Sequence, residues 1–518
     1  MDTSGRPGPE SWGPPRVVET HGALIFLCGD EAHKVRKPLD LGFLDNRTVE
    51  ARGEQSRREV ALNSRLAPDV YTGVLEVRGP DDEVIEHVVR MRRLPERDSL
   101  AQMVRSPQQG RSGSRVVEGL REVSRQIARL HAAGPHSAEI DAAGDPGVIA
   151  GLWAESLDHL RRLSVGEDAP GIVDEIATLA TAYLRGRAPL LQSRIADGRI
   201  VDGHGDLLAT DIYLTEDGPR IIDCLEFDDR LRFGDAMLDI GFLAMDLDRL
   251  GATDLAVVVL TSYREASGDD APTTLVHHYM AYRALVRAKV TAIRAAQGAG
   301  DGTDARLALD LTHRTVDALR RGRVRLVLVG GVSGSGKSTL ARPVAAALGA
   351  VLLRSDVVRR ELRAGSASGA DGAGGADGAG DVAGAAEGYS TGAVEAVYAE
   401  MLDRAAGLLA LGRSVVLDAT WLEPRRRAEA ETVATDAYAE LVEISCTAHR
   451  DELTRRITAR AREGADESEA TVEVLEGQLA GRAPWPEAIE VDTATLDARD
   501  TDAVRAWAAR ELGPLPWA

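Results

Sequence analysis

The sequence predicts two folded domains, an N-terminal α+β domain and a C-terminal α/β domain with a parallel sheet. A chain of 518 residues is too long for a single hydrophobic core. Residues 22–95 carry strand patterns, and helical periodicity dominates from there to about residue 320. After residue 323 strand and helix patterns alternate, which is typical of parallel strands joined by helices.

The composition indicates a protein that acts on a small molecule in a reducing compartment. Hydrophobic residues make up 44% and charged residues 28% of the chain, as in soluble globular proteins. The net charge of −20 would repel a nucleic acid, and runs such as LAVVVL are too short to span a membrane. The three cysteines, Cys28, Cys224 and Cys446, are scattered, which argues against disulfides or a zinc site. We therefore expect a cytoplasmic protein with a small-molecule partner and no membrane partner.

The first domain is expected to follow a disordered lead-in, residues 1–19, which is rich in Gly and Pro and lacks the apolar core of a signal peptide. Residues 22–37 then predict two strands joined by a Gly-Asp turn. The remaining elements follow in order: a helix over 47–66, a strand over 87–95, a helix that ends before Gly134, a loop–strand–turn–strand unit over 204–227, and helices over 235–320.

The second domain begins with a buried strand, RVRLVLVGG at 323–331. We place the border near 315–322, so that the domains cover 20–315 and 320–518. Residues 364–388 consist mostly of Gly, Ala, Ser and Asp, which cannot supply a core, and predict a flexible insertion. Their spacing does not match a calcium-binding Gly-Asp repeat.

A phosphate-binding loop is predicted directly after that strand. The stretch GVSGSGKS matches G-x-x-x-x-G-K-[ST] and precedes a helix, which is the context that this motif requires. Glycines let backbone N–H groups close around phosphates, and the helix N-terminus adds partial positive charge. Lys337 would reach the β and γ phosphates of ATP, and Ser338 would bind Mg²⁺. The nucleotide-binding residues predicted here are Gly331, Ser333, Gly334, Ser335, Gly336, Lys337, Ser338 and Thr339.

Two acids follow later strands of this domain. Asp356 and Arg359 form a D-x-x-R element, which resembles gluconate kinase, adenylylsulfate kinase and zeta-toxin-like enzymes. The resemblance implies that Asp356 contacts and deprotonates the acceptor hydroxyl and that Arg359 handles substrate. The alternative is an Asp N-cap with a surface Arg. Asp418, at the tip of a buried strand, is expected to hold the water shell of the metal.

Two further segments carry weaker resemblances. DATWLEPRRR resembles the polynucleotide-kinase-like branch, which implies that Thr420 and Arg427 face the acceptor. The Arg-rich helix DELTRRITARARE resembles the lid of nucleoside-monophosphate-kinase-like folds, in which arginines meet the transferring phosphate. Arg456 and Arg460 lie four residues apart on one helix face. A solvated Arg/Glu helix is the alternative interpretation.

In the first domain, HGDLLATDIYL and IIDCLEF resemble the aminoglycoside-phosphotransferase-like kinases. The resemblance implies a bilobal kinase-like fold, with lobes over about 20–95 and 96–315. Asp206 would take the position of the catalytic base, Asp223 would bind the metal, and Asp239 would brace the catalytic loop.

The same resemblance implies a strand lysine on the ATP phosphates with a glutamate partner on the following helix. Lys34 and Arg36 share one strand face, and Lys37 points the other way, so Lys34 is favoured and Lys37 stays open. Glu59 is the expected partner.

The chain departs from the family pattern at Asp211, where these kinases have Asn as a metal ligand. A carboxylate oxygen binds Mg²⁺ at least as well as an amide oxygen, so Asp211 is still predicted as a ligand. Only two asparagines occur in the whole chain, so a general loss of Asn from the sequence is enough to explain Asp211.

A kinase-like half followed by a P-loop half resembles a bacterial family of bifunctional aminoglycoside-phosphotransferase-like and ATP-binding proteins. KPLDLGFLD and EVALNSRLAPDVYTGV are typical of it. The expected function is a phosphotransferase with ATP and Mg²⁺ in both halves and a small-molecule hydroxyl as acceptor. Two alternatives remain: an N-terminal sensor that regulates a C-terminal P-loop enzyme, and a 5′-polynucleotide kinase.

Overall fold

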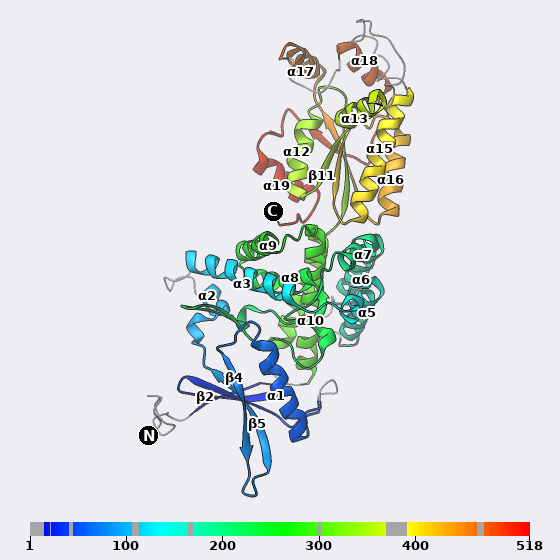
Figure 1. Ribbon diagram of the computed structural model, residues 1–518. Coiled ribbons are helices and arrows are strands. Elements are labelled where there is room, and N and C mark those ends of the chain that lie inside the picture. The colour runs from blue at the N-terminus through cyan, green and yellow to red at the C-terminus, as the bar shows by residue number, and fades with distance from the viewer. Residues whose placement is uncertain are drawn as a thin grey trace. The chain divides into compact units, whose positions relative to one another are not determined.

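The computed structural model describes residues 15–20, 22–40, 45–105, 113–163, 169–297, 302–368, 391–463 and 471–517 (Figure 1). From residue 369 onward, the predicted insertion 364–388 lies outside these ranges. The chain forms two compact units: unit 1 combines Met1–Ile149 with Arg194–Asp270, and unit 2 combines Ala150–Ser193 with Ala271–Ala518. The border predicted near 315–322 therefore falls inside unit 2.

Unit 1 contains a five-stranded antiparallel sheet with the strand order β1-β2-β3-β5-β4. Gly29, whose φ of 55° suits a tight turn, joins β2 to β3 as the Gly-Asp pattern predicts. The bounds are β1 (Arg16–Glu19), β2 (Ala23–Cys28), β3 (Glu31–Arg36), β4 (Tyr71–Arg78) and β5 (Val84–Arg92).

Strand β1 differs from the sequence prediction, which assigned residues 1–19 to a disordered lead-in. Arg16–Glu19 pairs with β2 in antiparallel register, with Val17 opposite Phe26 and Val18 opposite Ile25. The two β-branched valines favour an extended backbone, and the open edge of β2 supplies the hydrogen-bonding partner. Residues 1–14 lie outside the described part of the chain.

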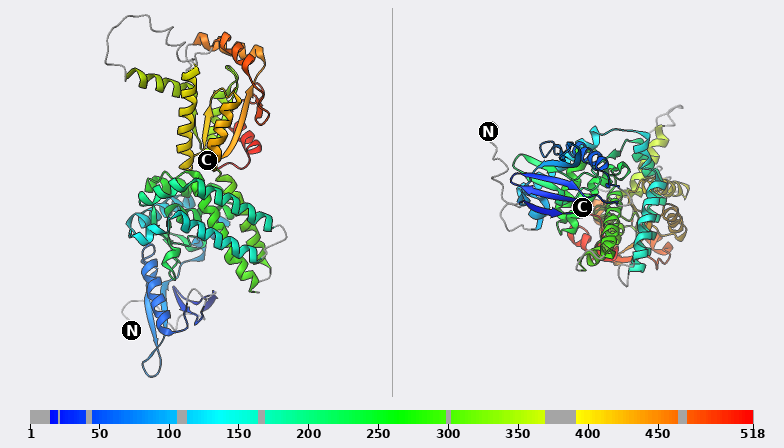
Figure 2. Two further views of the ribbon diagram at one scale, coloured as in Figure 1. Left: turned by 90° about the vertical axis from the view of Figure 1, so that its right-hand side faces the viewer. Right: turned by 90° about the horizontal axis from the view of Figure 1, so that it is seen from below.

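Helix α1 (Val49–Asn63) packs against β4 and β5 and carries Glu59 to the sheet (Figures 1 and 2). The Thr48 hydroxyl caps its N-terminus by accepting a hydrogen bond from the Ala51 N–H. Unusually, its buried face is polar: Arg52, Ser56, Glu59 and Asn63 recur at helical spacing and are all buried. Such a face is stable only if its charges are paired.

The rest of unit 1 is mainly helical and presents two loops, 203–211 and 222–232, between short strand pairs. Helix α3 packs along α9, and α8 also contacts α9. Strand β6 pairs with β9 and β7 with β8, both antiparallel. The elements are η2 (Glu96–Asp98), α2 (Leu100–Arg105), α3 (Ser114–Ala133), α4 (Ala138–Ala142), β6 (Ile200–Asp202), η4 (Ala209–Asp211), β7 (Ile212–Thr215), β8 (Gly218–Ile221), η5 (Asp229–Leu231), β9 (Phe233–Asp235), α8 (Ala236–Arg249) and α9 (Thr253–Ser267).

Unit 2 joins a group of helices to a parallel sheet. In the helical group, α10 packs along α11, and α11 packs against α6. These helices are α5 (Pro146–Leu163, most of it in unit 2), α6 (Ala169–Gly186), α7 (Ala188–Ala196, which ends in unit 1), α10 (Thr273–Ala296) and α11 (Thr303–Arg321).

The sheet of unit 2 has five parallel strands in the order β11-β12-β10-β13-β14. Helices α12 and α19 pack together on one face, and α15 and α16 cover the other (Figure 1). The strands are β10 (Arg325–Gly330), β11 (Val351–Arg354), β12 (Val415–Asp418), β13 (Glu440–Thr447) and β14 (Ile489–Asp492). The helices are α12 (Lys337–Leu348), α13 (Ser355–Ser368), α15 (Thr391–Ala410), α16 (Pro424–Asp436), α17 (Arg450–Glu463), α18 (Val472–Gly481) and α19 (Thr501–Glu511).

This arrangement confirms the predicted fold class: a kinase-like α+β fold and an α/β P-loop fold with a parallel sheet. The central strand β10 is buried along its whole length and leads directly into the Gly-rich loop. Open α/β sheets bind ligands at the carboxyl ends of the strands where the strand order reverses. In this sheet the order reverses at β10, so a ligand site is expected at the carboxyl end of β10. Across the described ranges, no helix is both long and apolar enough to cross a membrane.

Candidate functional site: two phosphate sites

The Gly-rich loop between β10 and α12 is held by close backbone contacts. The Gly331 N–H donates to the Thr420 carbonyl at 3.0 Å. Gly331, Gly334 and Gly336 have φ values of 142°, 82° and 84°, which side chains rarely allow. A Cβ at Gly331 would lie 2.5 Å from the Cys446 carbonyl oxygen. The motif therefore needs glycine at Gly331 for two reasons, the backbone angle and the space.

Thr493 and Arg456 clamp the loop from the outside. The Thr493 hydroxyl donates to the Ser335 carbonyl at 2.7 Å, and Arg456 Nη1 lies 2.9 Å from the same hydroxyl oxygen. Arg456 also donates to the Gly334 carbonyl at 3.3 Å and pairs with Glu452 at 2.6 Å. The predicted lid arginine thus contacts the loop backbone. The side chain of Arg460 lies outside what the structure describes.

Gln478 is a second loop contact that the sequence did not indicate. Its Oε1 accepts a hydrogen bond of 2.7 Å from the Ser333 N–H. Both Gln478 and Thr493 lie more than 140 residues after the loop in sequence, at separations of 145 and 158 residues. No local pattern marks either residue, so only the fold reveals them.

The charges of Lys337 and Asp418 both act on the buried thiol of Cys446. Lys337 begins α12, with Ser338 as the next residue of that helix. Burial raises the pKa of the Cys446 thiol to about 12, with Lys337 opposing and Asp418 adding to the rise, so both charges are close to this thiol. Asp418 is 3% exposed, and Arg354 Nε lies 3.3 Å from its Oδ2.

The second carboxylate oxygen of Asp418 fits a role beside a metal. Among the described residues, Oδ1 is buried without a hydrogen-bond partner. An unsatisfied buried carboxylate oxygen is costly, and the water shell of a magnesium ion would satisfy it. The chemistry of the Asp418 position therefore fits Mg²⁺.

The predicted acceptor residues lie on separate elements. Asp356 and Arg359 pair with each other at 2.9 Å within α13. Thr420 follows β12, and its hydroxyl lies 3.0 Å from the Tyr398 hydroxyl. Thr420 also accepts the Gly331 N–H through its carbonyl, so it lies next to the Gly-rich loop.

Arg427 is placed differently from the expectation that it faces an acceptor. It is 8% exposed, and it donates to the carbonyls of Trp421 at 3.0 Å and Pro484 at 2.8 Å. Its guanidinium also lies 5.0 Å from the centre of the Trp485 ring. These contacts tie two loops together, which is a structural use of the side chain.

In unit 1 the structure brings Lys34 to Glu59 and Asp223. The Lys34 ammonium lies 2.8 Å from Glu59 Oε1 and 3.5 Å from Asp223 Oδ1. Burial alone would lower the pKa of Lys34, but Glu59 and Asp223 raise it well above its usual value, so the side chain stays charged. Lys37 instead pairs with Glu19 at 2.5 Å, away from this cluster.

Arg36 and Glu226 extend this cluster and were not predicted as site residues. Arg36 Nη2 donates to Glu59 Oε2 at 2.5 Å and to Glu226 Oε1 at 2.8 Å. Arg36 is 5% exposed and Glu59 is 1% exposed. Arg36 could have been predicted, because it shares a strand face with Lys34. Glu226 lies 190 residues from Arg36, so no sequence pattern indicated that the two side chains meet.

Asp239 braces the loop that carries Asp206, which confirms the structural role predicted for it. Its carboxylate accepts the N–H groups of His204 at 2.7 Å and Gly205 at 2.9 Å. His131 Nε2 lies 3.0 Å from the same carboxylate. Burial alone would raise the pKa of Asp239, but these partners lower it well below its usual value.

The charges of Asp206 and Asp223 act on the third predicted acid of this site, Asp211. Burial and the charges of Asp223 and Asp206 raise the pKa of Asp211 well above its usual value. Asp223 has a φ of 64°, a left-handed conformation that Asp tolerates better than most residues. Its N–H donates to the Tyr71 hydroxyl at 3.3 Å. Backbone strain of this kind is typical of functional sites.

These carboxylates fit Mg²⁺ bound with a nucleotide. Within the described ranges, no group of three or more His, Cys, Asp or Glu side chains could hold a metal by itself. In phosphoryl-transfer sites, however, Mg²⁺ is commonly held by one or two carboxylates together with phosphates and water. A divalent cation between Asp211 and Asp223 would offset the repulsion that raises the pKa of Asp211.

Comparisons with known proteins cover both halves of the chain. Residues 326–485 match the family described as AAA domain (AAA_33). The chain is 40% identical over 482 residues to uncharacterized protein Rv2004c of Mycobacterium tuberculosis and to uncharacterized protein Mb2027c of Mycobacterium bovis. Each match covers 92% of this chain and 92% of the relative.

Solved structures resemble one half or the other. A choline/ethanolamine kinase family protein from Mesorhizobium loti is 18% identical, with 60% of this chain and 92% of that chain covered and a TM-score of 0.37. Aminoglycoside phosphotransferase APH(4)-Ia is 15% identical, with 60% and 96% covered and a TM-score of 0.34. A gluconokinase from Sinorhizobium meliloti is 21% identical, with 36% and 91% covered and a TM-score of 0.24.

The match to the mycobacterial proteins spans nearly the whole of both chains. The chain therefore belongs to the family of these mycobacterial proteins, and its residues 326–485 form the matched AAA domain.

Proposed function

We propose that the chain is an ATP-dependent phosphotransferase with two nucleotide sites, each of which transfers the γ-phosphoryl group to a hydroxyl of a small molecule. A sugar or an aminoglycoside is the class of acceptor that fits the resemblance best. The observation that carries the proposal is the contact of Lys34 with the buried Glu59 and with Asp223, whose side chain is 53% exposed. A charged lysine fixed by an acid beside a metal-binding aspartate is the arrangement that kinase folds use on ATP phosphates.

In the N-terminal site each side chain has a distinct task. Mg·ATP, when bound, would supply the phosphoryl group, and Asp211 and Asp223 would hold its metal. Lys34, held by Glu59, orients the α and β phosphates. Asp206 accepts the proton of the acceptor hydroxyl as that oxygen attacks. Asp239 keeps the backbone around Asp206 in place through its hydrogen bonds to His204 and Gly205.

In the C-terminal site the backbone does most of the binding. The N–H groups of the Gly-rich loop and the N-terminus of α12 surround the phosphates, with Lys337 on the outer ones. Ser338 would hold the metal directly, and Asp418 would hold it through water. Asp356 takes the role of base toward the acceptor and Arg359 that of its positive neighbour.

The test uses full-length protein with Lys337→Ala, so that only the N-terminal site turns over. ATP consumption is screened against a panel of sugars, aminoglycosides and nucleosides, and phosphate transfer to each hit is followed by mass spectrometry. Asp206→Ala should abolish this transfer and leave nucleotide binding intact. Lys34→Met should lower it by about a hundredfold, because a fixed cation on the phosphates is lost.

Lys37→Met is the matched control for Lys34→Met. Lys37 lies on the same strand end, but its partner is the exposed Glu19, so its removal should change the rate by less than about twofold. If both lysine variants lose transfer to the same extent, the assignment of Lys34 is wrong.

One observation favours a sensor as the second candidate for the N-terminal half. Burial and the charges of Asp223 and Asp206 raise the pKa of Asp211, which stands where related kinases have Asn, and this added negative charge would disfavour ATP phosphates. A sensor would bind a ligand and change ATP hydrolysis at the P-loop without transferring phosphate itself. Full-length protein with Asp206→Ala separates the two: a sensor keeps ligand-dependent hydrolysis, and a kinase loses all N-terminal transfer.

A further inference from the structure

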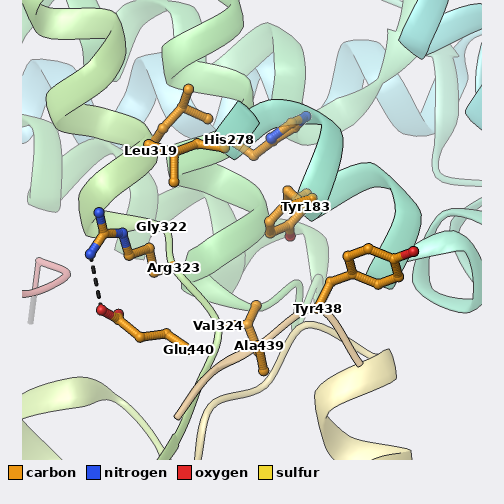
Figure 3. Close-up of a pocket in the computed structure, with 11 residues that line it drawn as sticks. Tyr183, His278, Leu319, Gly322, Arg323, Val324, Tyr438, Ala439 and Glu440 are labelled. Atoms are coloured by element: carbon orange, nitrogen blue, oxygen red, sulfur yellow. Dashed lines mark hydrogen bonds and ion pairs between the residues drawn. The ribbon is translucent and has the colours of Figure 1, made fainter. Parts of the chain in front are cut away.

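A cavity of about 440 Å³ lies within unit 2, between the helical group and the amino-terminal ends of β10 and β13 (Figure 3). It is separate from the Gly-rich loop, which follows the carboxyl end of β10. Its walls are mostly apolar, with two tyrosines, a histidine and one ion pair. The lining residues are Leu179, Ala182, Tyr183, His278, Leu319, Gly322, Arg323, Val324, Tyr438, Ala439 and Glu440.

One wall of the cavity is a rigid aromatic stack. The rings of Tyr183 and His278 are parallel within 15°, with centroids 4.3 Å apart, and Trp153 packs against His278 at 5.0 Å. His278 is 1% exposed. Among the described residues, neither of its ring nitrogens has a hydrogen-bond partner. A buried imidazole in this position can offer one donor and one acceptor to a ligand.

Tyr438, which precedes β13, contributes a second ring to the lining. It follows the C-terminus of α16, its φ is 49°, and it is 47% exposed. Helices usually end with glycine at such a left-handed position, because a side chain there is strained. An exposed aromatic ring at the mouth of a cavity, kept in a strained conformation, is suited to contact a flat molecule.

The charges around the cavity favour an anion. Arg323 and Arg325 share a single carboxylate, Glu440, at 3.0 and 2.8 Å. Arg187, whose guanidinium lies 5.9 Å from the centre of the Tyr183 ring, donates to the carbonyls of Leu409 and Ala437. It has no carboxylate partner among the described residues, and burial lowers its pKa to about 10. Two arginines, Arg323 in the lining and Arg325 beside it, therefore share one acid, although the chain as a whole has a net charge of −20.

We propose that this cavity binds a flat aromatic anion, with its ring between Tyr183 and Tyr438 and its acidic group on Arg323. The volume is sufficient for a molecule of one or two fused rings. The stack behind Tyr183 fixes that wall in advance, so little side-chain freedom is lost on binding. The site is distinct from both phosphate sites.

The experiment compares two fluorescent probes of nearly the same shape on full-length protein. 8-Anilinonaphthalene-1-sulfonate carries a negative charge, and N-phenyl-1-naphthylamine does not. The expected result is saturable binding of the anion at one site per chain, tighter than binding of the neutral probe. Absence of saturable binding of the anion overturns the proposal.

Two variants locate the binding. Arg323→Gln should weaken binding of the anion by about tenfold, the size of one charge-assisted hydrogen bond, and binding of the neutral probe by less than about twofold. Tyr438→Gly removes a ring and relieves the left-handed backbone, so the variant should fold at least as well and bind both probes about fivefold more weakly. Val290→Ser, on α10 outside the cavity, is the control for loss of exposed apolar surface and should change nothing. Equal loss in all three variants, or no loss in the first two, assigns the probes to another surface.

Discussion

The two phosphate sites are built from different parts of the chain. At the P-loop, one continuous stretch forms the binding surface, and three glycines set its backbone. At the N-terminal site, side chains as far apart as Arg36 and Glu226, separated by 190 residues, meet in a buried cluster of charges. The first site depends on space and backbone angle, and the second on the balance of buried charge.

Because the two sites are built differently, different substitutions should disrupt them. A backbone-built site does not tolerate an added methyl group at its glycines. A side-chain site tolerates small changes in shape but not the loss of one ion, because the partners left behind are buried and unpaired. The following substitutions test that contrast.

Arg36→Gln should have the largest effect on stability. It leaves Glu226 and one oxygen of Glu59 without their cation in a buried site. Breaking a buried ion pair on one side costs about 3–5 kcal/mol, so the free energy of unfolding of unit 1 should fall by that amount. Urea denaturation of the full chain measures it.

Arg93→Gln is the control for Arg36→Gln. The side chain of Arg93 is exposed and donates to the carbonyl of Gly29 at 3.3 Å, so its removal should leave the denaturation midpoint unchanged. If Arg36→Gln is equally neutral, the charge cluster does not hold unit 1 together, and the contrast between the two sites fails.

Gly331→Ala tests the backbone-built site. The added Cβ would lie 2.5 Å from both the Cys446 carbonyl oxygen and the Ser335 hydroxyl oxygen, at a φ of 142°. We expect a loss of about 2–3 kcal/mol in stability of the loop and loss of nucleotide binding in unit 2, measured by calorimetric titration.

Gly407→Ala offers the matched control, because a Cβ at Gly407 meets no atom within 4 Å. Gly407 lies inside α15, where alanine is the better helix former, so this variant should gain about 0.5–1 kcal/mol. If nucleotide binding survives Gly331→Ala, the loop has more space for a Cβ at Gly331 than the distances to Cys446 and Ser335 indicate.

The same contrast explains how much of the molecule could be predicted from sequence. The Gly-rich loop, the HGD loop and most strands and helices were found because their residues are neighbours in the chain. The Arg36–Glu226 contact and the Thr493 and Gln478 contacts to the loop were missed, since pairing between distant residues leaves no local pattern. Strand β1 was missed because its four residues follow a stretch of Gly and Pro, and its pairing with β2 decides its structure.

Acidic pH tests His278, a buried titratable group of unit 2 whose pKa is shifted by burial alone. The buried charges of the N-terminal site, by contrast, are paired with one another. Burial lowers the pKa of His278 to about 3, below the value of about 6.5 in an unfolded chain. The unfolded state therefore binds the extra proton between these values, and stability of unit 2 should fall as pH falls from 6.5 toward 3. At pH 5 the loss from this group is about 2 kcal/mol.

His278→Phe should remove that part of the pH dependence while keeping the aromatic stack. The free energy of unfolding at pH 7.5 and pH 5, compared between variant and parent, measures the difference. His159→Gln, which changes an exposed histidine of the same unit, should leave the pH dependence as it is. An identical slope in His278→Phe and the parent would mean that other groups cause the acid sensitivity.

Asp211→Asn should have the smallest effect, and it decides whether the departure from the kinase pattern matters. The amide is a weaker ligand for Mg²⁺, but it also removes the repulsion among Asp206, Asp211 and Asp223 that raises the pKa of Asp211. Because these effects oppose each other, N-terminal transfer in the Lys337→Ala background should change by less than about threefold, with a higher requirement for Mg²⁺. Asp223→Asn provides the comparison and should lower transfer by more than about a hundredfold, since it weakens the predicted metal ligand without a compensating gain. A gain of tenfold or more in Asp211→Asn would instead identify the carboxylate as the feature that holds the N-terminal site in a weakly active, sensor-like state.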